Sequence, residues 1–185
     1  MTTTPTPPVD VRSNLIAWAK WALANCAHFN WTEAGNKRMS ALGNFPPVFP
    51  MFMDCSAFVT WLYWISGAAD PNGGSAYKTN FLGRQGYTGT LLSHGTKLSN
   101  PTMCVPGDVV VYGGGTGEHT ALIVQVQGFD ILTISMGQQG DPEYTWVNKP
   151  SHLPQNGYAI DGRKPQTFLR FNTTAVNAVH LPPAA

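Results

Sequence analysis

The sequence carries little charge, and this limits the partners that it can bind. Only 11% of its 185 residues are Asp, Glu, Lys or Arg, and the formal net charge is +1. The sequence contains no block of basic residues. The release of counterions that drives binding to nucleic acids would therefore contribute little. We expect no nucleic-acid partner.

Long hydrophobic runs are also missing. The longest mostly apolar stretch, residues 57–65, is far shorter than the roughly 20 residues that cross a bilayer. The opening MTTTPTPPVD has neither the charged region nor the apolar region of a signal peptide. These two features predict no membrane span and a chain that is made without a signal peptide.

Cysteine is scarce, and the common metal-binding motifs are absent. The three cysteines, Cys26, Cys55 and Cys104, cannot all pair within one chain, so disulfides do not organise the fold. Neither HExxH nor CxxC occurs. We therefore expect no metal and no cofactor.

Apolar residues are plentiful enough for one folded domain. Hydrophobic residues make up 43% of the chain and aromatic residues 11%. Residues 1–10 are rich in Thr and Pro and predict a disordered arm, whereas 175–185 predict a linker-like tail. The domain itself is expected over residues 11–174.

The clearest helix in the sequence begins after Asp54. This residue is a typical N-cap, and Phe58, Leu62 and Ile65 follow at the i, i+4, i+7 spacing of one helix face. Gly67 is placed to end the helix. An earlier amphipathic helix is predicted over residues 11–26.

The second half of the chain changes to strand periodicity. The segments with alternating or continuous apolar residues are DVVVY, HTALIVQV, FDILTIS and TFLRF. Residues 68–102, which precede them, predict a long surface connection with one short helix near Leu91. Helices followed by antiparallel strands predict an α+β domain.

Two residues have the positions of a nucleophile and its base. Cys55 lies in the first turn of the predicted helix, where the helix dipole is expected to lower the pKa of a thiol. His119 opens a strand directly after a glycine-rich loop, so its imidazole is expected at the edge of the sheet. A buried structural cysteine and a solvated histidine remain the alternatives for these residues.

A third residue that orients the imidazole is expected on the next strand. A hairpin turn around 127–128 would place Met136 opposite His119, so the orienting group should lie within 134–139. Methionine cannot accept the imidazole proton usefully. The candidates that remain open are Ser135, Gln138 and Gln139, with Asp141 and Glu143 further along the chain.

Four segments together resemble the NlpC-type cell-wall cysteine peptidases. They are similar to the cysteine box, the strand-entry turn, the histidine box and the third-residue box of that family, over residues 11–172: DCSAFVTWLYW, PGDVVVYG, HTALIV and SMGQQGDP. Two intervening segments, ADPNG and GYTGTLLSHG, resemble versions of the family in phages of actinobacteria, where they form the peptidase part of endolysins or tail-tip lysins.

The resemblance implies a fold and a reaction. The fold would be papain-like, with N-terminal helices and the nucleophile helix packed on an antiparallel sheet. Cys55 is similar to the family's nucleophile and His119 to its general base. Relatives often read Ser-His-Gly-Ser-Glu in the third box, whereas this chain has Met136 in place of the His and Gln139 in place of the Glu. Gln139 is thus the expected third residue.

The resemblance also implies a substrate and a setting. The expected reaction is the hydrolysis of amide bonds in peptidoglycan stem peptides, next to D-glutamate or diaminopimelate. The enzyme would be a phage lysin peptidase that is made in the host cytoplasm and acts on the host cell wall. We expect a monomer that can be joined to further lysin domains.

Two other functions remain as alternatives. One is a zinc-dependent cell-wall amidase, whose ligands would come from His28, His94, His119, His152, Cys26 and Cys104. The other is a wall-binding or tail-structural module that keeps the fold without turnover, which the unusual third box makes conceivable.

Overall fold

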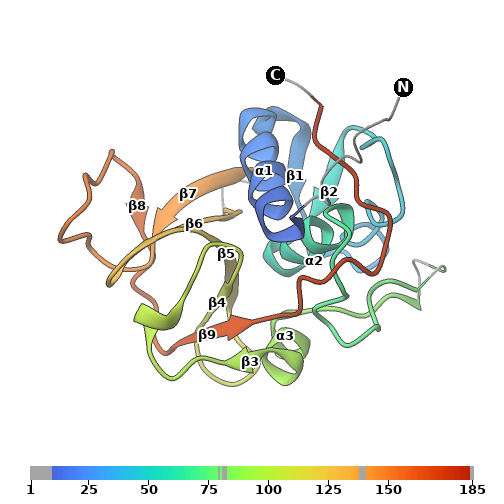
Figure 1. Cartoon of the computed structure of the whole chain (residues 1–185). Coiled ribbons are helices and arrows are strands. Elements are labelled where there is room, and N and C mark those ends of the chain that lie inside the picture. Colours follow the sequence, from blue (N-terminus) through green and yellow to red (C-terminus); the bar gives the residue numbers. More distant parts are fainter. Residues whose placement is uncertain (1–9, 79, 81–82, 138–140, 184–185) are drawn as a thin grey trace, which may run out of the picture.

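The computed structural model of the chain describes residues 10–78, 80, 83–137 and 141–183. The described helices come first along the chain and the main sheet follows (Figure 1). The α-helices are α1 (Val11–Ala24), α2 (Cys55–Ile65) and α3 (Thr88–His94). The strands are β1 (Phe29–Trp31), β2 (Met51–Met53), β3 (Thr96–Lys97), β4 (Val109–Tyr112), β5 (His119–Gln127), β6 (Asp130–Met136), β7 (Pro142–Trp146), β8 (Ala159–Ile160) and β9 (Gln166–Arg170).

The main sheet has the strand order β3-β9-β4-β5-β6-β7-β8. Its neighbouring strands are antiparallel except β7 and β8, which are parallel. Strands β1 and β2 form a separate parallel pair beside the helices. The prediction of an α+β domain with helices before antiparallel strands is confirmed.

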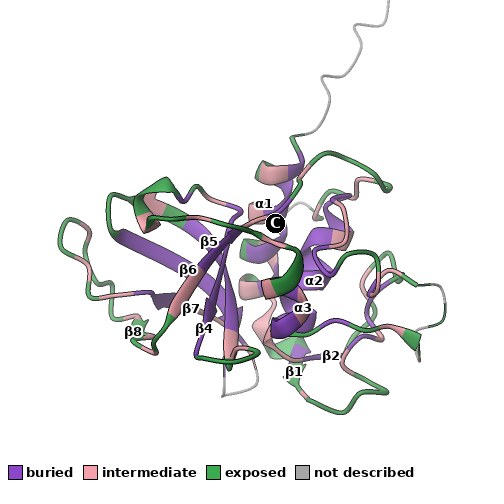
Figure 2. Ribbon diagram, turned by 90° about the horizontal axis from the view of Figure 1, so that it is seen from below, coloured by how far each residue is buried: buried purple, intermediate pink, exposed green. Residues whose placement is uncertain are grey.

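Helix α2 packs against α1 and against β5 and β6, and α1 also contacts β6 and β7, so both helices lie beside the sheet (Figure 2). Most of its side chains are buried on every side, which suits a helix whose sequence is apolar around its full circumference. Gly67 follows its end with a φ of +87°, the left-handed conformation expected after a helix end. The first residue of this helix, Cys55, is thereby held at a fixed point above the sheet.

A tight turn before β4 fastens both helices to the sheet. The carboxylate of Asp108 is fully buried and accepts hydrogen bonds from Arg12 of α1 at 3.1 Å and from Arg170 of β9 at 2.7 and 3.0 Å. The carbonyl of Gly107 accepts a bond from the Tyr63 hydroxyl of α2 at 2.8 Å. One turn therefore joins α1, α2 and the sheet.

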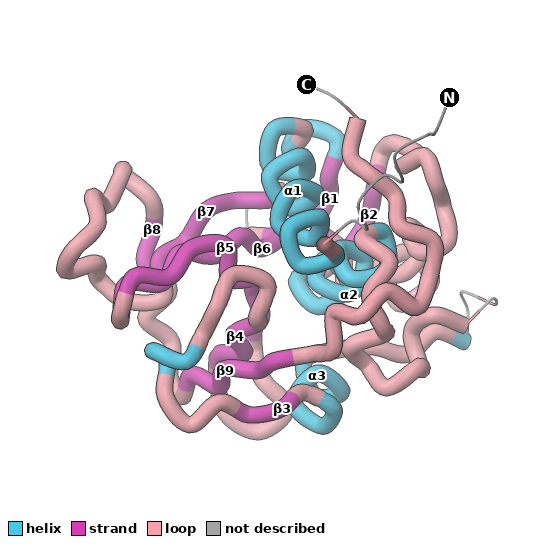
Figure 3. Tube along the Cα trace, viewed as in Figure 1, coloured by secondary structure: helices cyan, strands magenta, loops and turns pink. Residues whose placement is uncertain are grey.

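The C-terminal segment packs against the helices, although the sequence predicts a linker there. The backbone N–H of His180 donates to Ile65 at 3.2 Å, and its carbonyl accepts from the indole of Trp18 at 2.6 Å. The side chain of Asn177 donates to the carbonyl of Ala68 at 3.0 Å. Figure 3 shows this segment as a loop that runs along α1 and α2.

No helix within the described residues combines the length and the apolar character that a bilayer crossing requires.

The buried carboxylate of Asp108 generates a stability prediction. Asp108→Asn leaves two arginines without their shared counter-charge, so we expect the free energy of unfolding to fall by about 2–4 kcal/mol. Urea unfolding measures the change. Glu33→Gln, which removes an exposed carboxylate, is the control and should stay within about 0.5 kcal/mol of the wild type. An equal loss in both variants would contradict the special role of the buried turn.

Candidate active site

The start of α2 is fixed by the carboxylate of Asp54. One carboxylate oxygen accepts a hydrogen bond from the backbone N–H of Ala57 at 2.7 Å, which confirms the predicted N-cap. Arg38, from the loop between β1 and β2, donates to both carboxylate oxygens and to the hydroxyl of Ser56. The loop and the helix start therefore form one corner next to Cys55.

Cys55 and His119 line the same pocket, which has a volume of about 590 Å³. Both residues are half-buried, so neither side chain is sealed beneath apolar groups. The large aromatic side chains of Trp31 and Tyr87 lie on the wall of this pocket and are 44% and 49% exposed. The two residues that the sequence singles out are thus brought to one cavity from the helix and from the sheet.

The contacts of the sulfur place it beside the histidine strand. The backbone amides of Thr120, the residue after His119, and of Ser56 lie close enough to the Cys55 sulfur to favour its thiolate. The guanidinium of Arg38 acts in the same direction. The nucleophile position is thus next to the first residues of β5.

The prediction of a lowered thiol pKa is wrong. Removal from water and the neighbouring carboxylate of Asp54 both disfavour the thiolate, and together they raise the pKa of Cys55 to about 11. The helix start and the two amides act in the expected direction but are outweighed. At neutral pH, Cys55 is therefore a thiol.

His119 is held by a hydroxyl and by an aromatic ring. Its Nε2 lies 3.2 Å from the hydroxyl oxygen of Ser135, a fully buried residue on β6. Its ring stacks on Tyr112 of β4, with the centroids 5.8 Å apart and the planes inclined by 25°. The strands on both sides of β5 therefore fix the imidazole.

The imidazole is neutral over the physiological pH range. Burial and then the guanidinium of Arg163 lower the pKa of His119 to about 4, while the carboxylates of Asp161 and Asp54 act against this shift. A neutral imidazole can accept a proton, which is the state that a general base requires.

The register of the β5–β6 hairpin differs by one residue from the prediction. The turn lies at 128–129 rather than 127–128, and a bulge interrupts β5 further along. Continuing the observed pairing places Gly137, not Met136, opposite His119. Ser135 is then the diagonal neighbour of the histidine on the same face of the sheet.

The candidates for the third residue fall into three groups. Ser135 contacts the imidazole directly. Glu143 pairs with Ser135 in register and lines a second pocket together with His119, whereas Asp141 accepts a backbone hydrogen bond from Gly137 and lines neither pocket. Gln138 and the expected Gln139 lie outside the described residues.

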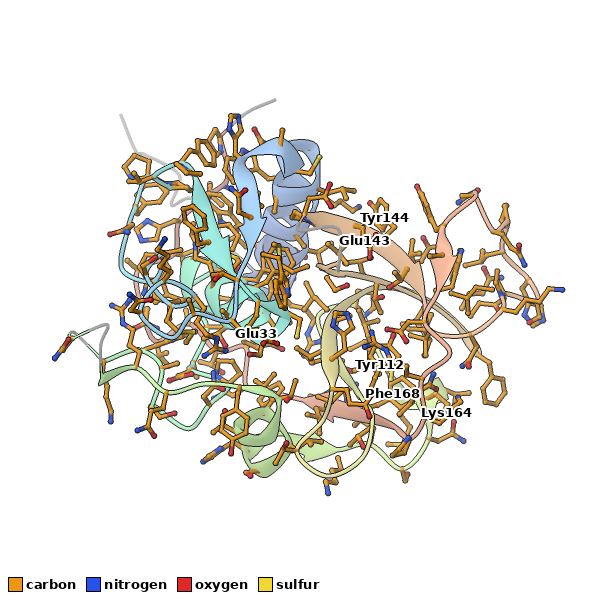
Figure 4. All side chains as sticks on the ribbon, turned by 180° about the vertical axis from the view of Figure 1, so that it is seen from behind. Glu33, Tyr112, Glu143, Tyr144, Lys164 and Phe168 are labelled. Atoms are coloured by element: carbon orange, nitrogen blue, oxygen red, sulfur yellow. The ribbon has the colours of Figure 1, made fainter. Side chains whose placement is uncertain are left out.

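The second pocket, of about 370 Å³, lies on the other side of His119. The side chain of Glu143 lies across Gly137, where a Cβ would be 2.2 Å from a carboxylate oxygen. Any larger residue at 137 would displace Glu143. Figure 4 places Glu143 at the start of β7 and Glu33, which lines the larger pocket, on the side of the helices. The remaining lining residues are Thr145, Ala159, Ile160, Asp161 and Arg163.

Several charged residues of the site, among them Arg38, Asp161 and Arg163, escaped the sequence reasoning. Arg38 comes from a proline-rich loop, and Asp161 and Arg163 come from the loop between β8 and β9. The sequence signal for the last two is a short polar segment, Asp-Gly-Arg, of a kind that many surface turns share.

The next feature is the spacing of the side chains that could bind a metal. Within the described residues, no three His, Cys, Asp or Glu side chains gather in the way that metal ligands do. The zinc amidase alternative therefore has no ligand set among these residues.

Comparison with known proteins identifies the architecture. No protein-family model and no curated protein matches the sequence. Among solved structures, NlpC2 from Trichomonas vaginalis superimposes with a TM-score of 0.51 at 12% identity, over 94% of this chain and 51% of that chain. NlpC1 from the same organism gives a TM-score of 0.50 at 13% identity, over 94% of this chain and 49% of that chain. The chain has an NlpC-type fold.

A bacterial protein of the same fold is also similar. The peptidoglycan hydrolase RipB from Mycobacterium tuberculosis gives a TM-score of 0.48 at 17% identity, over 91% of this chain and 73% of that chain. This chain spans about half the length of the two T. vaginalis chains. The predicted papain-like, NlpC-type fold is confirmed. At these identities the NlpC-type likeness concerns the fold.

The raised pKa of Cys55 predicts slow alkylation at neutral pH. Iodoacetamide reacts with the thiolate, and with a pKa of about 11 the thiolate fraction at pH 7.5 is small. We expect the rate at Cys55 to rise about tenfold per pH unit between pH 7 and 10. Peptide mapping by mass spectrometry follows the adduct, with Cys55→Ser as the control. A rate independent of pH between 6 and 8 would instead indicate a preformed thiolate–imidazolium pair.

Proposed function

We propose that this protein is a cysteine peptidase that hydrolyses amide bonds in peptidoglycan stem peptides. The observation that carries the proposal is the shared pocket of Cys55 and His119. The NlpC-type fold supports it because it is the fold of the peptidase family that the sequence motifs resemble. The quoted sequence motifs support the choice of substrate.

The proposed reaction begins with attack by the sulfur of Cys55 on the scissile carbonyl carbon. As the S–C bond forms, the thiol proton passes to Nδ1 of His119, because Nε2 is directed at Ser135. The imidazolium then protonates the leaving amine as the C–N bond breaks, which leaves a thioester. Water attacks the thioester, gives a proton to His119 and releases the acid product, and the thiol is restored.

The developing oxyanion needs hydrogen-bond donors. The backbone amide of Cys55 lies at the start of α2, where backbone N–H groups have no partner within the helix. The amide of Ala57, two residues further along, already donates a hydrogen bond to the carboxylate of Asp54. We therefore assign the oxyanion site to the amide of Cys55.

A lysin role is the finer form of this proposal. The resemblance of ADPNG and GYTGTLLSHG to segments of phage lysins supports it. The protein would then act on the host cell wall as a monomer, alone or joined to other lysin domains.

A catalytically weak wall-binding module is the second candidate. The protonation states of Cys55 and His119 favour this candidate. Their pKa values of about 11 and about 4 leave both groups uncharged at neutral pH. Such a module would bind peptidoglycan without releasing new amino groups.

Loss of the thiol separates the two candidates. We expect the wild type to release amino groups from purified peptidoglycan, and Cys55→Ala to lower that rate by at least a few hundredfold, because the covalent step is lost. Mass spectrometry of the released muropeptides identifies the bond that is cut.

The control for this experiment is Cys26→Ala, which removes a half-buried thiol elsewhere and should keep the wild-type rate. Binding without release by the wild type would establish the wall-binding module. Loss of activity to a chelator, with Cys55→Ala fully active, would establish a metal-dependent amidase.

The hydroxyl of Ser135 is proposed as the group that orients His119. Removing it in Ser135→Ala frees the ring, so we expect kcat to fall by about 10- to 100-fold with little change in KM. Ser135→Thr keeps a hydroxyl and should recover most of the rate. Full activity in Ser135→Ala would transfer the orienting role to another residue, with Gln139 as the expected one.

A further inference from the structure

The loop between β8 and β9 presents a rigid ion pair to the candidate site. Arg163 donates from Nε to Asp161 at 2.9 Å and from Nη2 to the second carboxylate oxygen. The backbone N–H of Asp161 donates to the carbonyl of Trp146 on β7 at 2.8 Å. Two parallel bonds and an anchored backbone fix the position of both charges.

The pair lies at the boundary between the two pockets. His119 and Arg163 are the residues that line both of them, and Asp161 lines the smaller one. The side chain of Asp161 is 10% exposed and that of Arg163 is 37% exposed. Arg163 therefore lines a pocket with both His119 and Cys55, and Asp161 lines the other pocket with His119.

Tyr112 connects the guanidinium to the imidazole. The guanidinium carbon of Arg163 lies 5.6 Å from the centre of the Tyr112 ring, and that ring stacks on His119. Tyr112 is fully buried, so its ring is fixed between the two groups. Figure 4 shows Tyr112 on the sheet, with Lys164, the residue after Arg163, and Phe168 in the same region.

We propose that Asp161 and Arg163 form a positioning pair that sets the charge around His119 during proton transfer. The inference rests on the function proposed above, since it concerns the proposed base. Arg163 keeps Asp161 from swinging into a direct ion pair with the imidazole. Asp161 remains close enough to favour the imidazolium that forms when the thiol gives up its proton.

Other charged and titratable groups also surround the imidazole. Asp54 and Cys55 at the start of α2, Glu143 of β7 and Glu118 line a pocket with it, as do Glu33 and Arg38, and Tyr112 of β4 stacks on it. Among them, Asp54 shares with Asp161 the effect of favouring the imidazolium, while Arg163 opposes it. The reciprocal effect is seen on Asp161, whose pKa is lowered mainly by its hydrogen bonds to Arg163 and also by His119.

Two substitutions with opposite expected effects test the pair. Nuclear magnetic resonance follows the titration of the His119 imidazole in the free protein, which for the wild type is expected at about pH 4. Arg163→Gln removes the opposing charge, so the pKa of His119 should rise by about half a unit to one unit. Asp161→Asn removes the favouring charge, so the same pKa should fall by a similar amount.

Lys164→Gln is the matched control. It removes a positive charge one residue from Arg163, where the side chain bonds Asn148 and Gln166 and lines neither pocket. Its titration should match the wild type. Arg163→Lys keeps the charge and should lie close to the wild type. Equal shifts in Arg163→Lys and Arg163→Gln, shifts of the same sign in Arg163→Gln and Asp161→Asn, or no shift in either would overturn the inference.

The activity profile provides the second readout. In the plot of kcat/KM against pH, the acidic limb should move to higher pH in Arg163→Gln and to lower pH in Asp161→Asn, as the pKa of His119 does. If the pKa of His119 shifts as expected but the acidic limb of kcat/KM does not, the role in proton transfer is also overturned. Failure of the proposed function is distinct, because the wild type would then show no hydrolysis that depends on Cys55.

Discussion

The arrangement of the site depends on the buried turn 106–108. Its carboxylate, at Asp108, holds an arginine from α1 and another from β9, and the adjacent carbonyl accepts the hydroxyl of Tyr63 from α2. A buried carboxylate requires well-placed hydrogen-bond donors, because each unsatisfied hydrogen bond in a dry interior lowers the stability of the fold. The turn therefore sets the helix that carries Cys55 relative to the sheet that carries His119.

Desolvation, more than neighbouring charges, sets the pKa values of the two proposed catalytic groups. Burial raises the pKa of Cys55 and lowers that of His119, so both are uncharged at neutral pH. In the proposed reaction, charge appears as the sulfur attacks, when the substrate displaces water and the oxyanion forms at the amide of Cys55. The proton then moves together with bond formation instead of before it. Two ion pairs, Arg38 with Asp54 and Arg163 with Asp161, are already in place beside the pocket before any charge forms on the reacting groups.

The sequence predicts the elements of this fold better than their contacts. The nucleophile helix, its N-cap Asp54, its terminal Gly67 and the strand that opens with His119 follow from local signals, and the structure confirms each of them. Local signals locate neither the turn nor the bulge: the turn at 128–129 alone would pair His119 with position 138, and the bulge in β5 moves the pairing back to Gly137.

The missed parts of the site come from distant segments. Asp161 reaches the histidine only because β8 pairs with β7 and returns the chain to that edge of the sheet. The pKa of Cys55 likewise depends on how deeply the folded chain buries the sulfur, which the position of a helix start does not indicate. The aromatic wall also comes from elsewhere, from Trp31 and Tyr87 rather than from α2.

The third box can depart from its usual sequence because orientation and charge are provided separately. A short hydroxyl at 135 reaches Nε2 because it is a diagonal neighbour on the same face, at 3.2 Å. Gly137, directly opposite, leaves the space that Glu143 occupies. A hydroxyl can orient an imidazole but adds no charge to stabilise an imidazolium. That charge comes from Asp161, held in place by Arg163, so one chain segment fixes the ring and another compensates its charge.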